Sequence, residues 1–327
     1  MLDVISLDFD PMATPFGVSM RLESLALAAV VVLVLVLIAF RAGRATPPEA
    51  APAAHGGRGT GRLRRDDLIL FAFGAVPGAI AGGRLGYGLI HLDFYGTNQG
   101  ALLDPAGGGL TLTLAVALGA VFAGAVGRLL SAPVGRWFGL ARGPVLLGLG
   151  LGKLAMVLGG SGQGVYSDSS WATSYAGDGP WGSLNAGYPA LPSQALEGIM
   201  VLAALGLLVV VIPALLRVRI QVTREAIEIG LWPPRHRVLP GGGRGFMVSL
   251  IFWAVARFAA AFTWRDAHVA GPFNAEQLVL VGLVAALLVL LTVPAVERRL
   301  RASLAARRAA RHAAAGADRD APGEAAA

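Results

Sequence analysis

The stretch SLALAAVVVLVLVLIAF, residues 24–40, carries no charged side chain and approaches the length of one membrane-crossing helix. Such a helix needs about 20 apolar residues to span about 30 Å of hydrocarbon. Six further windows share this character, so the sequence predicts an all-α polytopic membrane protein with seven transmembrane helices. The seven windows are 24–40, 68–90, 110–130, 143–160, 195–216, 246–264 and 277–296.

The distribution of basic residues predicts the orientation of these helices. Lys and Arg residues in short loops are retained on the cytoplasmic side of a membrane. Most of the 27 Lys and Arg residues lie between windows one and two, three and four, or five and six, or after window seven. We therefore expect the N-terminus outside and the C-terminus inside.

The composition favours a membrane protein and disfavours other classes. Hydrophobic residues make up 55% of the 327 residues and charged residues only 14%, which is unusual for a soluble domain. The cytoplasmic loops account for the net charge of +7, so no nucleic-acid partner is expected. The chain has no cysteine, so any thiol in its chemistry belongs to a substrate, and we expect no metal or other cofactor.

The sequence divides into a membrane domain, residues 1–297, and a basic cytoplasmic tail, residues 298–327. The tail and a linker at residues 45–62 are rich in small residues, and we expect both to be disordered. The first apolar window follows acidic residues and lacks a small-residue cleavage site, which indicates a retained span and not a signal peptide. An outer loop is expected at residues 161–193.

Aromatic residues recur in that outer loop, at Trp171, Tyr175, Trp181 and Tyr188. Aromatic side chains at such positions usually mark the membrane interface. The alternative is a lid or a substrate-docking surface on the outer side of the membrane.

Three cationic side chains, Arg84, Lys153 and Arg257, lie within the apolar windows. A charge in hydrocarbon costs free energy unless it faces a polar cavity or an opposite charge. We therefore expect all three to converge on one anion-binding cavity in the outer half of the bilayer. Two alternatives stay open: an ion pair between Lys153 and Glu197 or Glu276, and packing of Arg257 on aromatic rings.

Polar side chains near these cations extend the expected cavity. Tyr87 lies one helical turn from the first cation. Gln194 and Glu197 share a helix face at the start of the fifth span, where Ser193 is a candidate cap. Glycines around Lys153 allow a broken helix whose backbone N–H groups would help to hold an oxyanion.

Over roughly residues 8–297, the order of motifs resembles the bacterial phosphatidylglycerol:prolipoprotein diacylglyceryl transferases. The motifs that carry this resemblance are Gly82-Gly83-Arg84-Leu85-Gly86-Tyr87, Trp171-Ala172, Pro192-Ser193-Gln194-Ala195-Leu196-Glu197, Arg257-Phe258, Arg265-Asp266 and Gln277.

The resemblance implies a reaction and its partners. These transferases move a diacylglyceryl group from phosphatidylglycerol to the thiol of a lipobox cysteine in a prolipoprotein, in the bacterial inner membrane, and glycerol 1-phosphate leaves. The resemblance therefore implies lipid phosphate binding by the three cations. The side chains expected to line the cavity are Tyr87, Thr113, Ser193, Gln194 and Glu197.

Several positions depart from the family pattern: the asparagine and glutamate of the motif around Lys153 are gone, the tyrosine of the first span is Ser24, and three further positions differ. Lys153 stands in place of an arginine, Thr113 in place of the histidine expected to transfer a proton, and Ala261 in place of a glutamate. Lysine offers a phosphate a point charge in place of a bidentate fork. Threonine does not titrate near neutral pH. The sequence identifies no catalytic proton acceptor, and among the histidines only His91 is expected near an outer membrane face.

Two functions follow from these departures. The first is transfer that is slow at pH 7 and rises toward the thiol pKa of about 8.5. The second is phospholipid binding without catalysis, by a relative that has kept the anion cavity. A small-solute transporter is disfavoured because nothing indicates inverted repeats.

Overall fold

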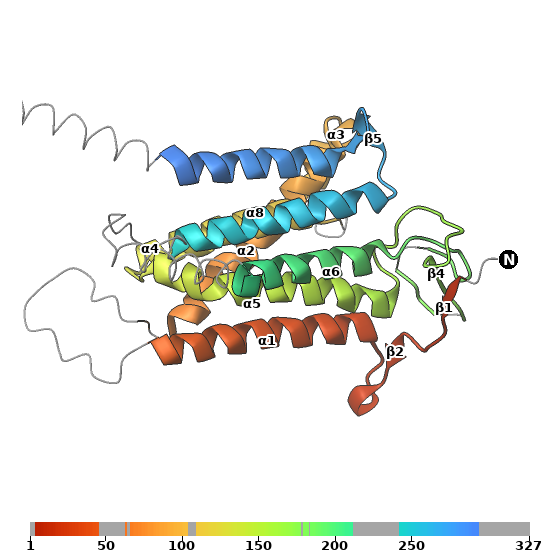
Figure 1. The fold of residues 1–327 in the computed structure, drawn as a ribbon, viewed down its shortest axis with the longest axis horizontal. Helices are drawn as coiled ribbons and strands as arrows, with labels where there is room; N and C mark the ends of the chain where they lie inside the picture. The colour runs from red at the N-terminus through yellow and green to blue at the C-terminus, as the bar shows by residue number, and fades with distance from the viewer. Residues whose placement is uncertain are drawn as a thin grey trace, which may run out of the picture. The chain divides into compact units, whose positions relative to one another are not determined.

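The computed structural model describes residues 4–45, 63, 66–103, 109–177, 179–182, 184–211 and 242–293. This part of the chain is mostly helical and contains seven helices long and apolar enough to cross a membrane, which confirms the fold class (Figure 1). They are α1 (Leu22–Ala45), α2 (Asp66–Ile90), α4 (Leu112–Leu129), α5 (Val134–Ala155) with its extension η4 (Met156–Gly159), α6 (Ser193–Gly206) with η5 (Leu207–Val211), α8 (Gly243–Ala260) with η6 (Ala261–Thr263), and a seventh candidate span, Ala275–Val293.

The chain divides into two compact units, Met1–Leu283 and Val284–Ala327. All elements described below belong to the first unit. The expected linker at 45–62 lies outside the described residues except for Ala45, which ends α1, and the expected tail at 298–327 lies outside them entirely. The orientation of the helices across the membrane stays a prediction.

Short elements at the helix ends were not predicted. Strand β1 (Ile5–Leu7) pairs in parallel with β4 (Thr173–Tyr175). Two antiparallel pairs join β2 (Met12–Ala13) to β3 (Met20–Arg21), and β5 (His268–Ala270) to β6 (Phe273–Asn274). The single-turn elements are η1 (Pro15–Gly17), α3 (Leu92–Tyr95) and η2 (Gln99–Leu103). The labelled strands gather at the end of the helices where the N-terminus lies, which we call the strand end (Figure 1).

Helix α5 is central to the packing, because it contacts α1, α6 and α8, while α6 also contacts α8. Helix α2 packs chiefly against α4. Glycines at every fourth position of α2 allow this close approach. A Cβ atom added at Gly78 would lie 2.6 Å from Cβ of Phe122. A Cβ atom added at Gly74 would lie 2.7 Å from the carbonyl oxygen of Phe122.

The fourth span differs from the prediction at its start and ends at Gly159, one residue from the predicted end. Helix α5 begins at Val134 and not at 143, so Arg142 lies inside it. Contacts of the buried Trp137 hold the extra turns. Its ring centroid lies 5.8 Å from that of Phe71, and its indole N–H donates a hydrogen bond to Asp67. Arginines and glycines lower the hydropathy of these turns without preventing a helix, so a hydropathy window misses them. The glycines around Lys153, which would allow a broken helix, lie within α5, and the helix continues directly into η4.

The outer loop folds back on the N-terminal segment. Tyr175 of β4 is buried, and its ring packs against those of Phe9 and Trp181. Burial raises the pKa of Tyr175 to about 12. Trp171 and Tyr188 are exposed, so the loop aromatics divide between internal packing and the surface.

Candidate functional site

Three helices bring Lys153, Glu197 and Arg257 together at the strand end. Lys153 lies in the last turn of α5, Arg257 in the last turn of α8, and Glu197 in the first turns of α6. Lys153 Nζ lies 2.9 Å from Glu197 Oε2, and Arg257 Nη1 pairs with the other carboxylate oxygen. Glu197 is only 1% exposed, so one buried carboxylate holds two cations.

A second carboxylate holds the opposite edge of Arg257. Arg257 Nη2 lies 3.1 Å from Glu276 Oε1, and Nε lies 3.3 Å from the same oxygen. Nε also lies 3.2 Å from Thr113 Oγ1, and the buried Thr113 hydroxyl donates to Glu276. The ion pair considered for Lys153 is therefore present with Glu197. In this cluster the positive charges of Lys153 and Arg257 are balanced by the negative charges of Glu197 and Glu276.

An aromatic ring covers the two cations. The Trp264 ring centroid lies 4.5 Å from Arg257 Cζ and 5.9 Å from Lys153 Nζ. Both distances fall within the range of cation–π attraction. The aromatic packing considered for Arg257 is thus present, and the ring comes from the segment that follows η6.

These side chains border a polar pocket of about 380 Å³. This volume falls in the range of small-molecule sites. Its lining combines cations that would bind an anion with carboxylates that would bind or move protons. The lining residues are Lys153, Gly162, Gln163, Glu197, Arg257, Trp264, Arg265 and Asp266.

The Arg257 guanidinium keeps donors for a ligand. A guanidinium carries five N–H groups. Its contacts with Glu197, Glu276 and Thr113 engage one N–H on each of its three nitrogens. Within the described part of the chain, one N–H on each terminal nitrogen is left for an anionic oxygen, without displacing either carboxylate.

Arg84 lies elsewhere, so the structure brings together two of the three predicted cations. Its guanidinium donates to the backbone carbonyls of Ala101, Leu102 and Gly109, at 3.1, 3.1 and 3.2 Å. It is not among the residues that line the pocket in the described chain. Tyr87 lies near Arg84, because the Tyr87 ring packs against Gly109, whose carbonyl accepts from Arg84. The phosphate-binding role of Arg84 stays a prediction.

Ser193 and Gln194 brace the helix that presents Glu197. Ser193 Oγ donates to the Thr263 carbonyl at 2.9 Å, which ties α6 to the end of η6. Gln194 Nε2 donates to the Tyr175 hydroxyl at 3.3 Å. Both side chains are buried. The side chain of Ser193 does not cap the helix, for which Pro192 is the N-cap residue.

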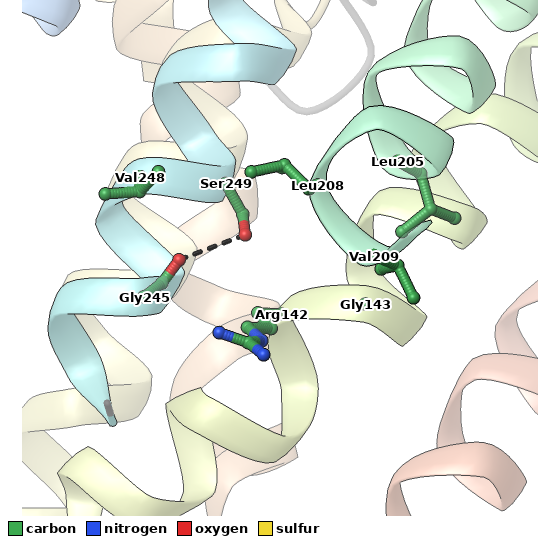
Figure 2. Close-up of a pocket in the computed structure, with 8 residues that line it drawn as sticks. All are labelled: Arg142, Gly143, Leu205, Leu208, Val209, Gly245, Val248 and Ser249. Atoms are coloured by element: carbon green, nitrogen blue, oxygen red, sulfur yellow. Dashed lines mark hydrogen bonds between the residues drawn. The ribbon is translucent and has the colours of Figure 1, made fainter. Parts of the chain in front are cut away.

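A second hollow, beside the N-terminal half of α5, is lined by an arginine without such partners (Figure 2). It measures only about 20 Å³ and is lined by Arg142 and Ser249 among apolar side chains and glycines. Ser249 donates to the Gly245 carbonyl and not to the guanidinium. No carboxylate in the described residues forms an ion pair with Arg142.

Residues 11–293 match the family model of the prolipoprotein diacylglyceryl transferases. The chain belongs to this family. No curated protein matches it. The family match includes all seven candidate spans, so the chain is a multi-pass membrane member of a transferase family that acts on prolipoproteins.

Two family positions can now be placed. Thr113, where the family resemblance puts a histidine, touches both Arg257 and Glu276. Ala261, where it puts a glutamate, has no carboxylate, and Glu276 supplies one beside Arg257 instead.

Sequence reasoning missed most of the pocket wall. Glu276 entered only as one possible partner of Lys153, although it is the one acidic residue of the seventh span, which is a signal for function. Trp264 lies in a connecting segment, where no periodic pattern marks the residues that face a pocket, and Asp266 entered only as part of the Arg265-Asp266 motif, without a role.

Proposed function

We propose that this protein is an active transferase that moves the diacylglyceryl group of phosphatidylglycerol to the thiol of a lipobox cysteine, releasing glycerol 1-phosphate. The observation that carries the proposal is that Lys153 and Arg257 line the same polar pocket, where Glu197 holds both of them. Family membership supplies the reaction class.

Lys153 and Arg257 would bind the lipid phosphate. The two remaining N–H groups of Arg257 suit two phosphate oxygens, and Lys153 adds a point charge. As the bond between the glycerol carbon and the phosphate oxygen breaks, negative charge grows on the leaving phosphate. Preorganised cations lower the energy of that transition state.

The neighbouring groups would hold this arrangement in place. Glu197 and Glu276 fix the guanidinium from two sides, and Trp264 covers it. Because Ser193 and Gln194 tie the start of α6 to its neighbours, they fix Glu197. Arg84 and Tyr87 lie beside Gly109, and from there they would make the predicted contacts, Arg84 with the lipid phosphate and Tyr87 with the cavity.

The proposed setting is the bacterial inner membrane, with the N-terminus outside. In this orientation the strand end, and with it the pocket, faces the outer side. A prolipoprotein would present its cysteine there, and phosphatidylglycerol would enter from the surrounding lipid. The basic loops would lie in the cytoplasm.

A second candidate function is phospholipid binding without catalysis. The observation that favours it is the Thr113 hydroxyl, which is buried and donates to Glu276. It therefore cannot replace the histidine as a proton acceptor.

One experiment separates the two functions. Purified protein in phosphatidylglycerol vesicles is given a lipobox peptide, and the peptide mass is followed between pH 6 and 9. An active transferase adds a diacylglyceryl group to the cysteine. Tight binding of phosphatidylglycerol with no modified peptide at any pH would instead identify a binding protein. Arg257→Glu should abolish lipid binding, and Arg299→Glu, in the C-terminal tail, should leave it unchanged.

A further inference from the structure

The proposed reaction needs a group that removes the thiol proton, and three carboxylates lie near the cations. Glu197 pairs with both Lys153 and Arg257, and Glu276 accepts from Arg257 and Thr113. Both are therefore occupied as partners of the phosphate-binding groups.

Asp266 differs from them in both position and bonding. It lines the pocket directly, on the same wall as Trp264 and Arg265. Its carboxylate makes no hydrogen bond or ion pair with another described residue. Of the two carboxylates that line the pocket, it is the one left to accept a proton.

We propose that Asp266 accepts the thiol proton in place of the missing histidine. This inference rests on the proposed transferase function. Asp266 shares one pocket with Lys153 and Arg257, so a thiol between the carboxylate and the bound phosphate would meet both groups that the reaction needs.

The environment of Asp266 makes it a better base than an ordinary aspartate. Asp266 is an exposed residue at the pocket mouth, but partial desolvation there raises its pKa, and the negative charge of Glu276 raises it further. The positive charges of His91, Arg257 and Arg265 act in the opposite direction, with smaller effects than burial. A base with a raised pKa lies closer to the thiol pKa of about 8.5, which favours proton transfer.

The step balances in atoms and charge. The S–H proton passes to the Asp266 carboxylate, and the sulfur electron pair forms a bond to the glycerol carbon that carries the phosphate. The bond from that carbon to the phosphate oxygen breaks, and its electrons leave with glycerol 1-phosphate. Asp266 then returns the proton to the leaving phosphate or to water.

The test is the pH dependence of transfer by the full-length wild type and by Asp266→Asn, with phosphatidylglycerol vesicles and a lipobox peptide. Asparagine matches aspartate in size but cannot take the proton. Asp93→Asn is the matched control, because Asp93 is an exposed carboxylate like Asp266 but is not among the residues that line the pocket. Lipid binding is measured for each protein, together with its melting temperature.

We expect Asp266→Asn to transfer about 10²-fold more slowly at pH 7, within the usual range for loss of a general base. Its remaining rate should rise about tenfold per pH unit toward the thiol pKa, while lipid binding stays unchanged. Asp266→Glu should recover part of the rate, and Asp93→Asn should match the wild type.

Three outcomes would overturn the inference. A wild-type pH profile and rate in Asp266→Asn would show that the proton goes elsewhere. A slower rate with an unchanged profile would make Asp266 a positioning residue. An inactive wild type with intact lipid binding would refute the transferase function itself, and the inference with it.

Discussion

Two arginines in transmembrane helices have opposite surroundings. Arg257 is held by two carboxylates, a threonine and a tryptophan ring beside a pocket of about 380 Å³. Arg142 borders a hollow of about 20 Å³ whose wall is mostly apolar (Figure 2) and a wider pocket of about 280 Å³ shared with Arg136, and no carboxylate of the described residues forms an ion pair with it. A cation within a helix is thus not sufficient for a site. The partners that fix its geometry distinguish a binding group from a basic residue that merely lies inside a helix.

The largest expected effect comes from removing the paired arginine. Arg257→Gln leaves Glu197 and Glu276 buried without their main cation, and breaking a buried ion pair costs about 3–5 kcal/mol. We expect a marked fall in the melting temperature and a loss of transfer of at least about 10³-fold. Arg142→Gln should change stability by less than about 1 kcal/mol and transfer by less than about twofold. If Arg257→Gln and Arg142→Gln lowered the melting temperature and the transfer rate equally, the two arginines would not differ in function as proposed.

A double substitution separates stability from function at Arg257. Arg257→Gln leaves the carboxylates of Glu197 and Glu276 without their arginine. The double variant Arg257→Gln/Glu276→Gln removes one of these two charges, so part of the lost stability should return. Transfer should stay as low as in Arg257→Gln, because the phosphate ligand is still missing. Melting temperatures and initial rates of the three variants test this. Recovery of transfer together with stability would show that Arg257 acts only in folding.

Substitution of Lys153 tests the second cation. Lys153→Met should lower transfer about 10- to 100-fold and weaken lipid binding, since Glu197 loses one partner and the phosphate one charge. Lys153→Arg provides the bidentate donor typical of the family, so we expect binding at least as tight as in the wild type. Equilibrium binding of phosphatidylglycerol measures both. Weaker binding by Lys153→Arg than by Lys153→Met would contradict a phosphate role.

Removing the aromatic cover should have a smaller effect. Trp264→Leu removes a cation–π contact worth roughly 1–2 kcal/mol, so lipid binding should weaken about 5- to 20-fold. Phe262→Leu is the control, because that ring is 54% exposed and does not line the pocket. Titration with phosphatidylglycerol distinguishes the two. If both variants bind equally well, the ring does not contribute to the site.

The smallest expected effect is a change in melting temperature caused by the charge of Asp266. Its pKa is raised in the folded protein, so the folded state favours the neutral carboxyl. That contribution to stability is present below the unfolded pKa and is lost as the pH rises through the folded pKa. Asp266→Asn should therefore melt slightly higher than the wild type at pH 7, and at the same temperature at pH 3. A lower melting temperature at pH 7 would indicate a stabilising partner for the charged form.

The sequence predicted the helices far better than the pocket. Seven apolar windows located all seven spans, because crossing a membrane demands length and apolarity that are visible in any window. The start of α5 was missed, because Trp137 and its partners Phe71 and Asp67 hold those turns by contacts distant in sequence.

Within the site, the sequence identified the side chains whose burial is costly. Lys153, Glu197 and Arg257 stand out for that reason. The sequence did not show that Arg84 binds backbone carbonyls or that Glu276 faces Arg257, since both depend on how the helices pack. Asp266 entered the sequence analysis only as part of the Arg265-Asp266 motif, without a role, because no periodic pattern shows which residues of a connecting segment face a pocket.

The most direct test of the account is photocross-linking with a phosphatidylglycerol that carries a photoreactive group on its headgroup. The protein in vesicles is irradiated, digested and mapped by mass spectrometry. If Lys153 and Arg257 bind the phosphate, the label should concentrate on the pocket residues at 162–163 and 264–266 and be lost in Arg257→Glu. A label concentrated around Arg142 and 205–209, and unaffected by Arg257→Glu, would contradict the account.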